Sequence, residues 1–206
     1  MLTVRFVRHG ESAANAGGTS SDPALIPLTD LGWAQAKAVA ETFSEAPDLI
    51  VTSPFERAKD TALPTTQRFP ECPVEEWPIE EFTYLSPARC ANTTAAERKP
   101  WVESYWNSAD PQYSDGHRTE SFVGLVDRAR SVLRELHGMK GAATIFGHGQ
   151  FIQAIRWLIV EPQERIDSAA MRSFRSFDIA HPITNGESLI FTHDGQRWLS
   201  KKWSSI

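Results

Sequence analysis

Short apolar segments that alternate with helical segments are the feature that most restricts how this chain can fold. Residues 2–7 are rich in β-branched and aromatic side chains, residues 48–52 are DLIVT, and residues 142–146 form a third such run. A stretch with helical signals follows each of them. Strands that alternate with helices pack as a mostly parallel sheet with helices on its faces. The sequence therefore predicts an α/β fold with a mostly parallel central sheet between two layers of helices.

Capping and breaker residues place two helices in the first half of the chain. Thr29 is a candidate N-cap for a helix that runs to residue 43. Residues 53–56, Ser-Pro-Phe-Glu, have the pattern of a capping box with proline at the first helical position. We expect this second helix to kink or end at Pro64, because proline lacks the N–H that an interior position donates.

Helical periodicity is clearest in the second half of the chain. Apolar side chains recur at three-to-four spacing over residues 121–137, and Gly138 stands where that helix should end. Residues 150–160 predict a further helix. Weaker strands are expected over residues 74–79, 187–192 and 197–203, the last two as a hairpin around Asp194-Gly195.

Residues 83–118 are the least regular part of the chain. One helix is expected within residues 96–108, and Pro100 should then lie near its first turn. The aromatic side chains of Trp101, Tyr105 and Trp106 either cover a pocket or pack the segment on the core. We expect residues 1–206 to form a single domain in which residues 83–118 are a variable, cap-like segment.

Composition and charge narrow the functional class. The 206 residues carry a formal net charge of −5, which argues against a general nucleic-acid-binding protein. No apolar run has the length of a signal peptide or a membrane span, so we expect no membrane association. Cys72 and Cys90 are too few for a disulfide framework. We therefore expect a cytoplasmic protein with reduced thiols.

Three strand-to-helix junctions carry residues suited to chemistry. The first strand ends in Arg8-His9-Gly10, the second leads into a helix with Arg57 in its first turn, and residues 147–149 are Gly-His-Gly around His148. Ligands of open α/β sheets bind outside the carboxyl ends of the strands. Two histidines and two arginines should therefore meet at one edge of the sheet, although each taken alone is more often a surface or structural residue.

Such a cluster would suit a phosphate group. Arginine presents a planar, permanently charged fork that matches phosphate oxygens, and a helix N-terminus adds free N–H groups. A neutral imidazole is a competent nucleophile, and nearby arginines disfavour its protonated form. None of the six histidines forms an i, i+4 pair of the kind found in helical zinc sites, so we expect neither a metal nor another cofactor.

The motifs at these junctions, taken in order, resemble those of the histidine phosphatase superfamily, the phosphoglycerate-mutase-like proteins. The resemblance implies that family's three-layer fold. The matching positions run from residue 4 to about residue 192: Arg8 to Ser12 with Asn15; Leu28-Thr29 with Gly32, Gln35 and Ala36; Ser53-Pro54 with Arg57-Ala58 and Thr61; Glu120-Ser121 with Arg128; Gly147-His148-Gly149; and Asn185 before Ser188-Leu189-Ile190.

The resemblance also implies a role for each matching residue. His9 would be the nucleophile that becomes a phosphohistidine. Arg8, Arg57 and His148 would hold the phosphoryl oxygens, His148 as part of the catalytic set, and Asn15 would add a hydrogen bond. The family's general acid is a carboxylate after the third strand, where Glu81 fits best, with Glu80 as the alternative.

A phosphatase acting on a small phosphomonoester without a metal is the reading we favour. A phosphoglycerate-type mutase is the first alternative, but this chain lacks an ERxYG-like stretch after the acid. A protein that binds phosphorylated ligands without turnover is the second. The expected partners are a small phosphorylated substrate or inorganic phosphate, with the chain as monomer or homodimer.

Overall fold

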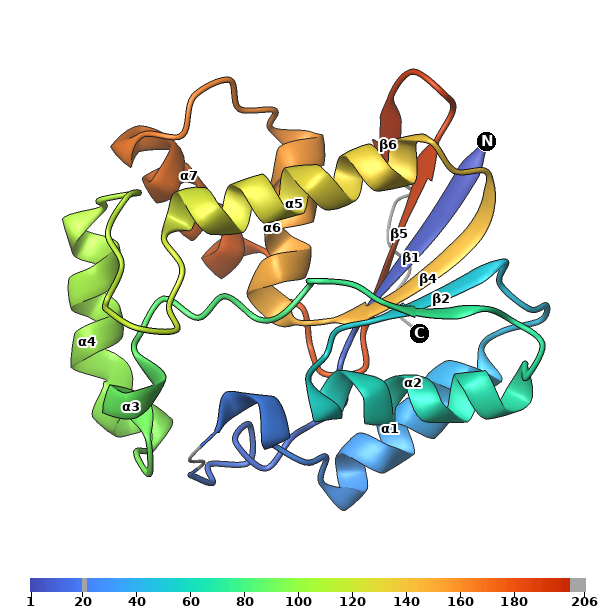
Figure 1. Cartoon of the computed structure of the whole chain (residues 1–206), viewed down its shortest axis with the longest axis horizontal. Coiled ribbons are helices and arrows are strands. Elements are labelled where there is room, and N and C mark those ends of the chain that lie inside the picture. Colours follow the sequence, from blue (N-terminus) through green and yellow to red (C-terminus); the bar gives the residue numbers. More distant parts are fainter. Residues whose placement is uncertain (20–21, 201–206) are drawn as a thin grey trace.

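A computed structural model describes residues 1–19 and 22–200 of the chain. Within these ranges one sheet of six strands forms the centre of the molecule (Figure 1), in the order β3-β2-β4-β1-β5-β6. The four strands from β3 to β1 are parallel, while β5 and β6 run antiparallel to their neighbours. The strands are β1 (Leu2–Arg8), β2 (Leu49–Thr52), β3 (Val74–Glu76), β4 (Gly141–Gly147), β5 (Ser188–His193) and β6 (Trp198–Ser200). The predicted α/β fold is confirmed.

Helices cover both faces of this sheet. One face carries α1 (Asp30–Glu41) and α2 (Glu56–Arg68), and the other carries α5 (Phe122–His137) and α6 (Gly149–Val160), as Figure 1 shows. Helix α7 (Ser168–Ala180) packs beside α6. The short α3 (Pro87–Cys90) and α4 (Ala95–Ser108) lie to one side of the sheet. No helix in the described ranges is long and apolar enough to span a membrane.

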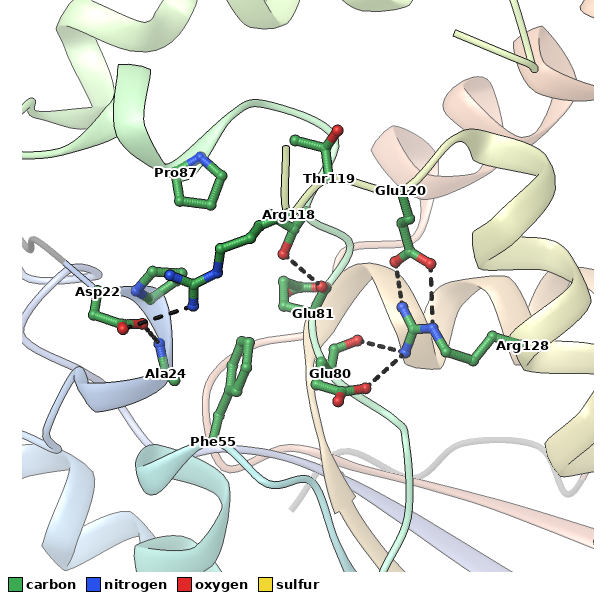
Figure 2. A pocket seen from close by; sticks show the side chains of 12 residues that line it. Asp22, Ala24, Phe55, Glu80, Glu81, Pro87, Arg118, Thr119, Glu120 and Arg128 are labelled. Carbon is green, nitrogen blue, oxygen red and sulfur yellow. Dashed lines mark hydrogen bonds and ion pairs between the residues drawn. The ribbon is translucent and has the colours of Figure 1, made fainter. Parts of the chain in front are cut away.

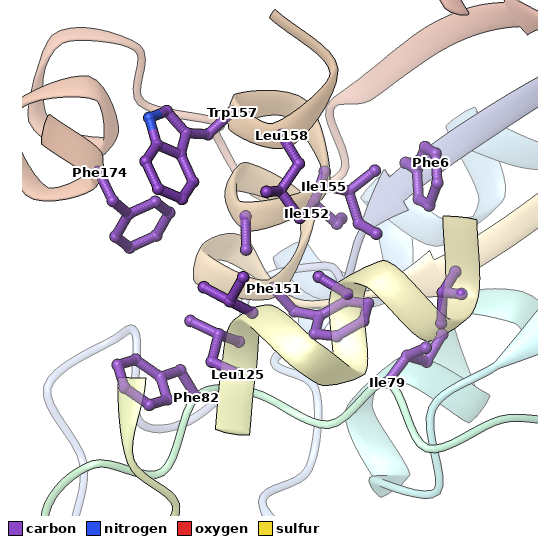
Figure 3. Close-up of a cluster of buried hydrophobic side chains, with 14 of the residues drawn as sticks. Phe6, Ile79, Phe82, Leu125, Phe151, Ile152, Ile155, Trp157, Leu158 and Phe174 are labelled. Atoms are coloured by element: carbon purple, nitrogen blue, oxygen red, sulfur yellow. The ribbon is translucent and has the colours of Figure 1, made fainter. Parts of the chain in front are cut away.

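Two clusters of buried hydrophobic side chains pack the helices against the sheet. On the α5–α6 side, alternate residues of β1 such as Val4 and Phe6 join one core cluster with Leu125 and Ile152, all fully buried or nearly so. Figure 3 shows Phe6, Leu125 and Ile152 in this cluster. The opposite face of β1 contributes Val7 to a smaller core beneath α1 and α2. Burying apolar area on both faces is what drives this three-layer packing.

Strand register brings the chemical motifs together. Because β1 and β4 are adjacent and parallel, Arg8 pairs with Gly147, so His9 and His148 each follow the last paired residue of their strands. On the other side of β4, Thr52 of β2 pairs with Phe146, which brings Ser53 to the same edge. The expected meeting at the carboxyl edge of the sheet follows directly from this register.

The capping box predicted at residues 53–56 is wrong. Helix α2 begins at Glu56, and its N-cap, Phe55, makes no side-chain capping bond. The Ser53 hydroxyl lies 2.8 Å from Nε2 of His148 and accepts the backbone N–H of Phe55. The helix also continues through Pro64 to Arg68; beyond the proline, Thr65 is buried and Arg68 donates to the carbonyl oxygen of Ala40 in α1.

Two further boundaries differ from the prediction, and two α-helices, α3 and α7, were missed. Pro100 is the sixth residue of α4, since a Thr94–Glu97 capping box starts that helix earlier than expected. Strand β3 ends at Glu76, two residues before a proline that cannot donate to a ladder. Helix α7 was not predicted, although Asp167 accepts two N–H groups as its N-cap. The last residues of the predicted hairpin, 201–203, lie outside the described ranges.

The aromatic side chains of residues 83–118 do not share one role. Tyr105 and Trp106 are buried and join Phe82 and Phe122 in a cluster of edge-on rings. They therefore pack the segment onto the core. Trp101 instead lies near the surface, under the guanidinium group of Arg89.

Candidate active site

His9 is held in one orientation by its own loop. Its Nδ1 lies 2.7 Å from the carbonyl oxygen of Gly10, so this nitrogen is the one that carries the proton and donates. Nε2 is then left as a lone-pair nitrogen, 3.1 Å from Nε of Arg57. The side chain is 3% exposed. Burial, and then the charge of Arg57, lower its pKa to about 3, which makes the imidazole neutral near pH 7.

His148 faces His9 across the carboxyl edge of the sheet. Their ring centroids are 5.2 Å apart. His148 is fully buried, and this burial, followed by the Arg57 charge, lowers its pKa well below the usual value. Its Nε2 is bound to Ser53, and the edge of Phe55 packs against the ring. Among the described residues its Nδ1 has no hydrogen-bond partner.

Arg57 links His9 to the loop after β1. Besides Nε, which donates to His9, its Nη1 donates to the carbonyl oxygen of Pro23 at 2.6 Å. Its guanidinium group lies 4.9 Å from the ring centroid of Phe55. Burial lowers the pKa of Arg57 to about 10 while the Glu81 carboxylate opposes that shift, so the group stays charged at neutral pH. A buried cation thus stands against the free nitrogen of His9.

Arg8 and Glu81 meet at the first residue of α6. A Cβ built on Gly149 would lie 3.5 Å from Nε of Arg8 and 3.7 Å from Oε2 of Glu81, so both side chains surround this glycine. Arg8 donates through Nη1 to the carbonyl oxygen of Ile183, while its buried Nε has no partner within the described ranges. An added Cβ at position 149 would make ordinary van der Waals contacts with both side chains, which places Arg8 and Glu81 on the same side of this residue.

The two neighbouring glutamates, Glu80 and Glu81, have different interaction partners. Oε1 of Glu81 accepts the N–H groups of Phe82, Gln150 and Phe151, which fixes the carboxylate at the N-terminus of α6. Glu80 instead pairs with Arg128, and Figure 2 shows this ion pair turned away from Glu81. Only Glu81 therefore has a carboxylate oxygen, Oε2, beside Arg8 and near Arg57.

Asn15 lies in the same loop as His9, and its side-chain hydrogen bonds stabilise that loop. Its Oδ1 accepts from the backbone and hydroxyl groups of Ser12 and from Nδ2 of Asn185. Asn185 also donates to the carbonyl oxygens of His9 and Gly10. The predicted contact of Asn15 with a phosphate stays a prediction.

Several contributors to the site were not among the predicted site residues. Ser53, Phe55 and the carbonyl oxygen of Pro23 orient His148 and Arg57, and Asn185 holds the backbone on both sides of the His9–Gly10 peptide. Only Ser53 and Asn185 stood in recognisable motifs. The partners themselves depend on the tertiary fold, which brings positions more than 90 residues apart into contact.

The donors gathered here have the chemistry that a phosphate requires. Two arginines supply positive potential, and two buried nitrogens, Nε of Arg8 and Nδ1 of His148, have no partner in the described part of the chain. A buried donor without a partner is costly, so an oxyanion that accepts from such groups would be strongly favoured. No group of three or more His, Cys, Asp or Glu side chains in the described ranges could hold a metal ion.

Comparison with known proteins agrees with this site. A family model described as "Histidine phosphatase superfamily (branch 1)" matches residues 4–205. The metal-independent phosphoserine phosphatase of Arabidopsis thaliana is 29% identical over 209 residues, covering 98% of this chain and 81% of that protein. The glucosyl-3-phosphoglycerate phosphatase of Mycolicibacterium vanbaalenii is 28% identical over 160 residues, covering 73% and 70%.

The solved structures show the same fold. The phosphoserine phosphatase from Entamoeba histolytica, in complex with 3-phosphoglyceric acid, superimposes with a TM-score of 0.74 at 18% identity, covering 100% of this chain and 98% of that chain. At this identity the likeness establishes the shared architecture alone. The family match, which spans nearly the whole chain, establishes the relationship. This chain belongs to the histidine phosphatase superfamily.

Proposed function

We propose that this chain is a phosphatase that hydrolyses a small phosphomonoester through a phosphohistidine intermediate and without a metal ion. One observation carries the proposal: the buried, neutral His9 is fixed through Nδ1, and its Nε2 faces Arg57. A nucleophile needs a lone pair near neutral pH and a cation beside it to neutralise the charge of the attacked group. Both conditions are met at the same atom.

In the first step, Nε2 of His9 attacks the phosphorus atom and the bond from phosphorus to the leaving oxygen breaks. Phosphoryl oxygens accept the N–H groups of Arg57, which releases Nε2 for the attack. Arg8 and His148 donate to the remaining oxygens through Nε and Nδ1, the nitrogens without a partner in the described part of the chain. Such fixed donors stabilise the charge that spreads over the phosphoryl group in the transition state.

Glu81 is the group we assign to proton transfer. Three backbone N–H groups hold its Oε1, so Oε2 is the oxygen that gives a proton to the leaving alkoxide. In the second step the same carboxylate takes a proton from a water molecule, which attacks phosphorus. The bond from phosphorus to Nε2 then breaks, inorganic phosphate leaves, and His9 is again neutral.

The matched relatives support a small substrate. They are named as phosphatases of phosphoserine and of glucosyl-3-phosphoglycerate. The cavities beside Glu81 have volumes of about 290 and 230 Å³, which suits a small leaving group better than a protein segment. We propose that residues 83–118 are the cap of this single domain, because they supply walls of both cavities.

Hydrolysis of phenyl phosphate in the presence of a chelator tests this function. The metal-free mechanism predicts the same release of inorganic phosphate with excess EDTA as without it. Activity that appears only after addition of a divalent cation would contradict the mechanism. Release of phosphate without any requirement for 2,3-bisphosphoglycerate would separate a phosphatase from a mutase.

A further inference from the structure

A cavity of about 230 Å³ opens from the proposed reaction centre toward the cap segment. Arg57 and Glu81 line it, and Arg57 donates to Nε2 of His9, so the cavity lies beside the proposed nucleophile and can take a leaving group bound to phosphorus there. Its volume equals that of roughly eight water molecules. A leaving group of about the size of a benzene ring with one substituent fits in this volume.

Apolar side chains form most of the cavity wall. They come from three separate parts of the chain: Ile26 after β1, Phe82 and Leu85 after β3, and Val102 on α4. Ile26 and Phe82 are also buried. Binding a leaving group here removes apolar surface from water, which favours a substrate with an apolar body.

Besides Arg57, one further cation, Arg98 on α4, lines this cavity among the described residues. It projects from the second turn of α4 and is partly buried. Its Nη1 donates to the carbonyl oxygen and hydroxyl group of Thr93, which fixes the guanidinium plane. No ion pair to Arg98 is found among the described residues, whereas the neighbouring Arg89 is paired with Asp115. Arg98 thus keeps N–H groups for an anion.

We propose that Arg98 makes this chain selective for phosphomonoesters whose small apolar leaving group ends in a carboxylate. The phosphoryl group occupies the His9 end, the apolar body lies against the walls, and the carboxylate accepts from Arg98. The inference rests on the proposed phosphatase function and adds to it the class of substrate. A guanidinium group held in place by a backbone oxygen loses little freedom on binding, which favours a specific contact with a carboxylate.

A pair of matched substrates isolates this contact. The phosphate esters of 4-hydroxybenzoate and of 4-hydroxybenzamide have nearly the same shape, but only the first is anionic at the far end. The phosphate esters of 3-hydroxybenzoate and 3-hydroxybenzamide form a second pair, in which the carboxylate or amide lies closer to the phosphoryl group. We expect kcat/KM for the better carboxylate to exceed that of its amide by about tenfold, the usual size of one charge-assisted hydrogen bond.

Variants of Arg98 then assign the selectivity to this side chain. The carboxylate-to-amide ratio should fall close to one in Arg98→Gln and below one in Arg98→Glu, while Arg98→Lys should keep part of it. Lys99→Gln is the control, because Lys99 is exposed, pairs with Glu103 and does not line the cavity. A loss of the Thr93 contact alone would slow both substrates equally and leave the ratio unchanged.

The outcomes separate the two proposals. A wild-type ratio near one for both substrate pairs, or a ratio that stays the same in Arg98→Gln and Arg98→Glu, would overturn the selectivity while hydrolysis itself continues. The wild-type comparison needs no variant to fold. Absence of hydrolysis of every ester, or hydrolysis that survives in His9→Ala, would instead overturn the phosphatase function.

Discussion

At the scale of single residues, burial and hydrogen bonding set the properties of this site. His9 and His148 are removed from water beside Arg57, so both are neutral where a surface histidine would be partly charged. Glu81 and Glu80 are adjacent in sequence, yet their partners differ completely. The same residue type therefore has different chemistry according to the element it contacts.

The two glutamates provide the first prediction. Glu81→Gln should lower kcat by 10²–10⁴-fold, the usual contribution of a general acid, because an amide cannot supply a proton to the leaving group. The loss should be larger for an alkyl phosphate than for p-nitrophenyl phosphate, whose leaving group needs no proton. Glu80→Gln is the matched control and should stay within a few-fold of wild type. Equal losses in both variants would contradict the assignment.

The lowered pKa of His9 predicts how stability depends on pH. The unfolded chain binds a proton at His9 near pH 6.5, whereas the folded chain does so only near pH 3. Protonation therefore favours the unfolded state as the pH falls below about 6.5, and the stability present above that pH is lost progressively.

Urea unfolding at pH 7 and pH 5 measures this effect in wild type and in His9→Gln. The free energy of unfolding should fall by about 1–2 kcal/mol more in wild type than in the variant, because the variant lacks this titrating group. Equal changes in the two proteins would show that His9 titrates normally in the folded state.

At the scale of elements, the register of the strands is what brings the residues of the site together. The pairing of Arg8 with Gly147 brings two histidines 139 positions apart to one edge of the sheet. The backbone groups at that edge are then held by side chains from other elements. Gly10, for example, donates its N–H to Thr61 of α2.

Helix capping gives a prediction at this scale. Ser121 accepts the backbone N–H of Gly124 at the start of α5, so Ser121→Ala should lower the free energy of unfolding by about 1 kcal/mol. Activity should be preserved, since this hydroxyl makes no contact with the proposed reacting groups. Ser131→Ala is the control: its exposed hydroxyl bonds only within the helix, and its loss should be close to neutral. A similar loss in both variants, seen in urea unfolding, would argue against the cap.

The sequence was informative where local signals and long-range packing agree. Apolar runs located β1, β2 and β4, and the glycines around His9 and His148 marked the junctions. It failed where tertiary contacts compete with local rules: Ser53 has the spacing of an N-cap, but its hydroxyl is bound to His148. Pro64 and Pro100 are tolerated inside helices because the surrounding turns are otherwise well packed or capped.

At the scale of the whole molecule, the site joins segments from almost the entire chain. Its side chains come from the ends of β1 and β4, the start of α2, the segment after β3 and the loop before β5. A ligand that binds these groups together should therefore stabilise the folded state as a unit.

Inorganic phosphate or vanadate tests this coupling. At a ligand concentration about 100 times Kd, binding adds about 2.7 kcal/mol of stability. For a chain of this length, that corresponds to a rise in Tm of about 5–10 °C. The rise should be reduced strongly in Arg57→Gln, which removes the cation shared by the two histidines. An equal rise in both proteins would place the anion elsewhere.

Trapping of the phosphoenzyme tests the central claim most directly. Enzyme mixed briefly with a radiolabelled phosphomonoester and quenched in alkali should carry label that is stable in base and released by acid, as a phosphohistidine is. His9→Ala should carry no such label and should not turn over substrate. Label that persists in His9→Ala, or full activity of that variant, would contradict the account.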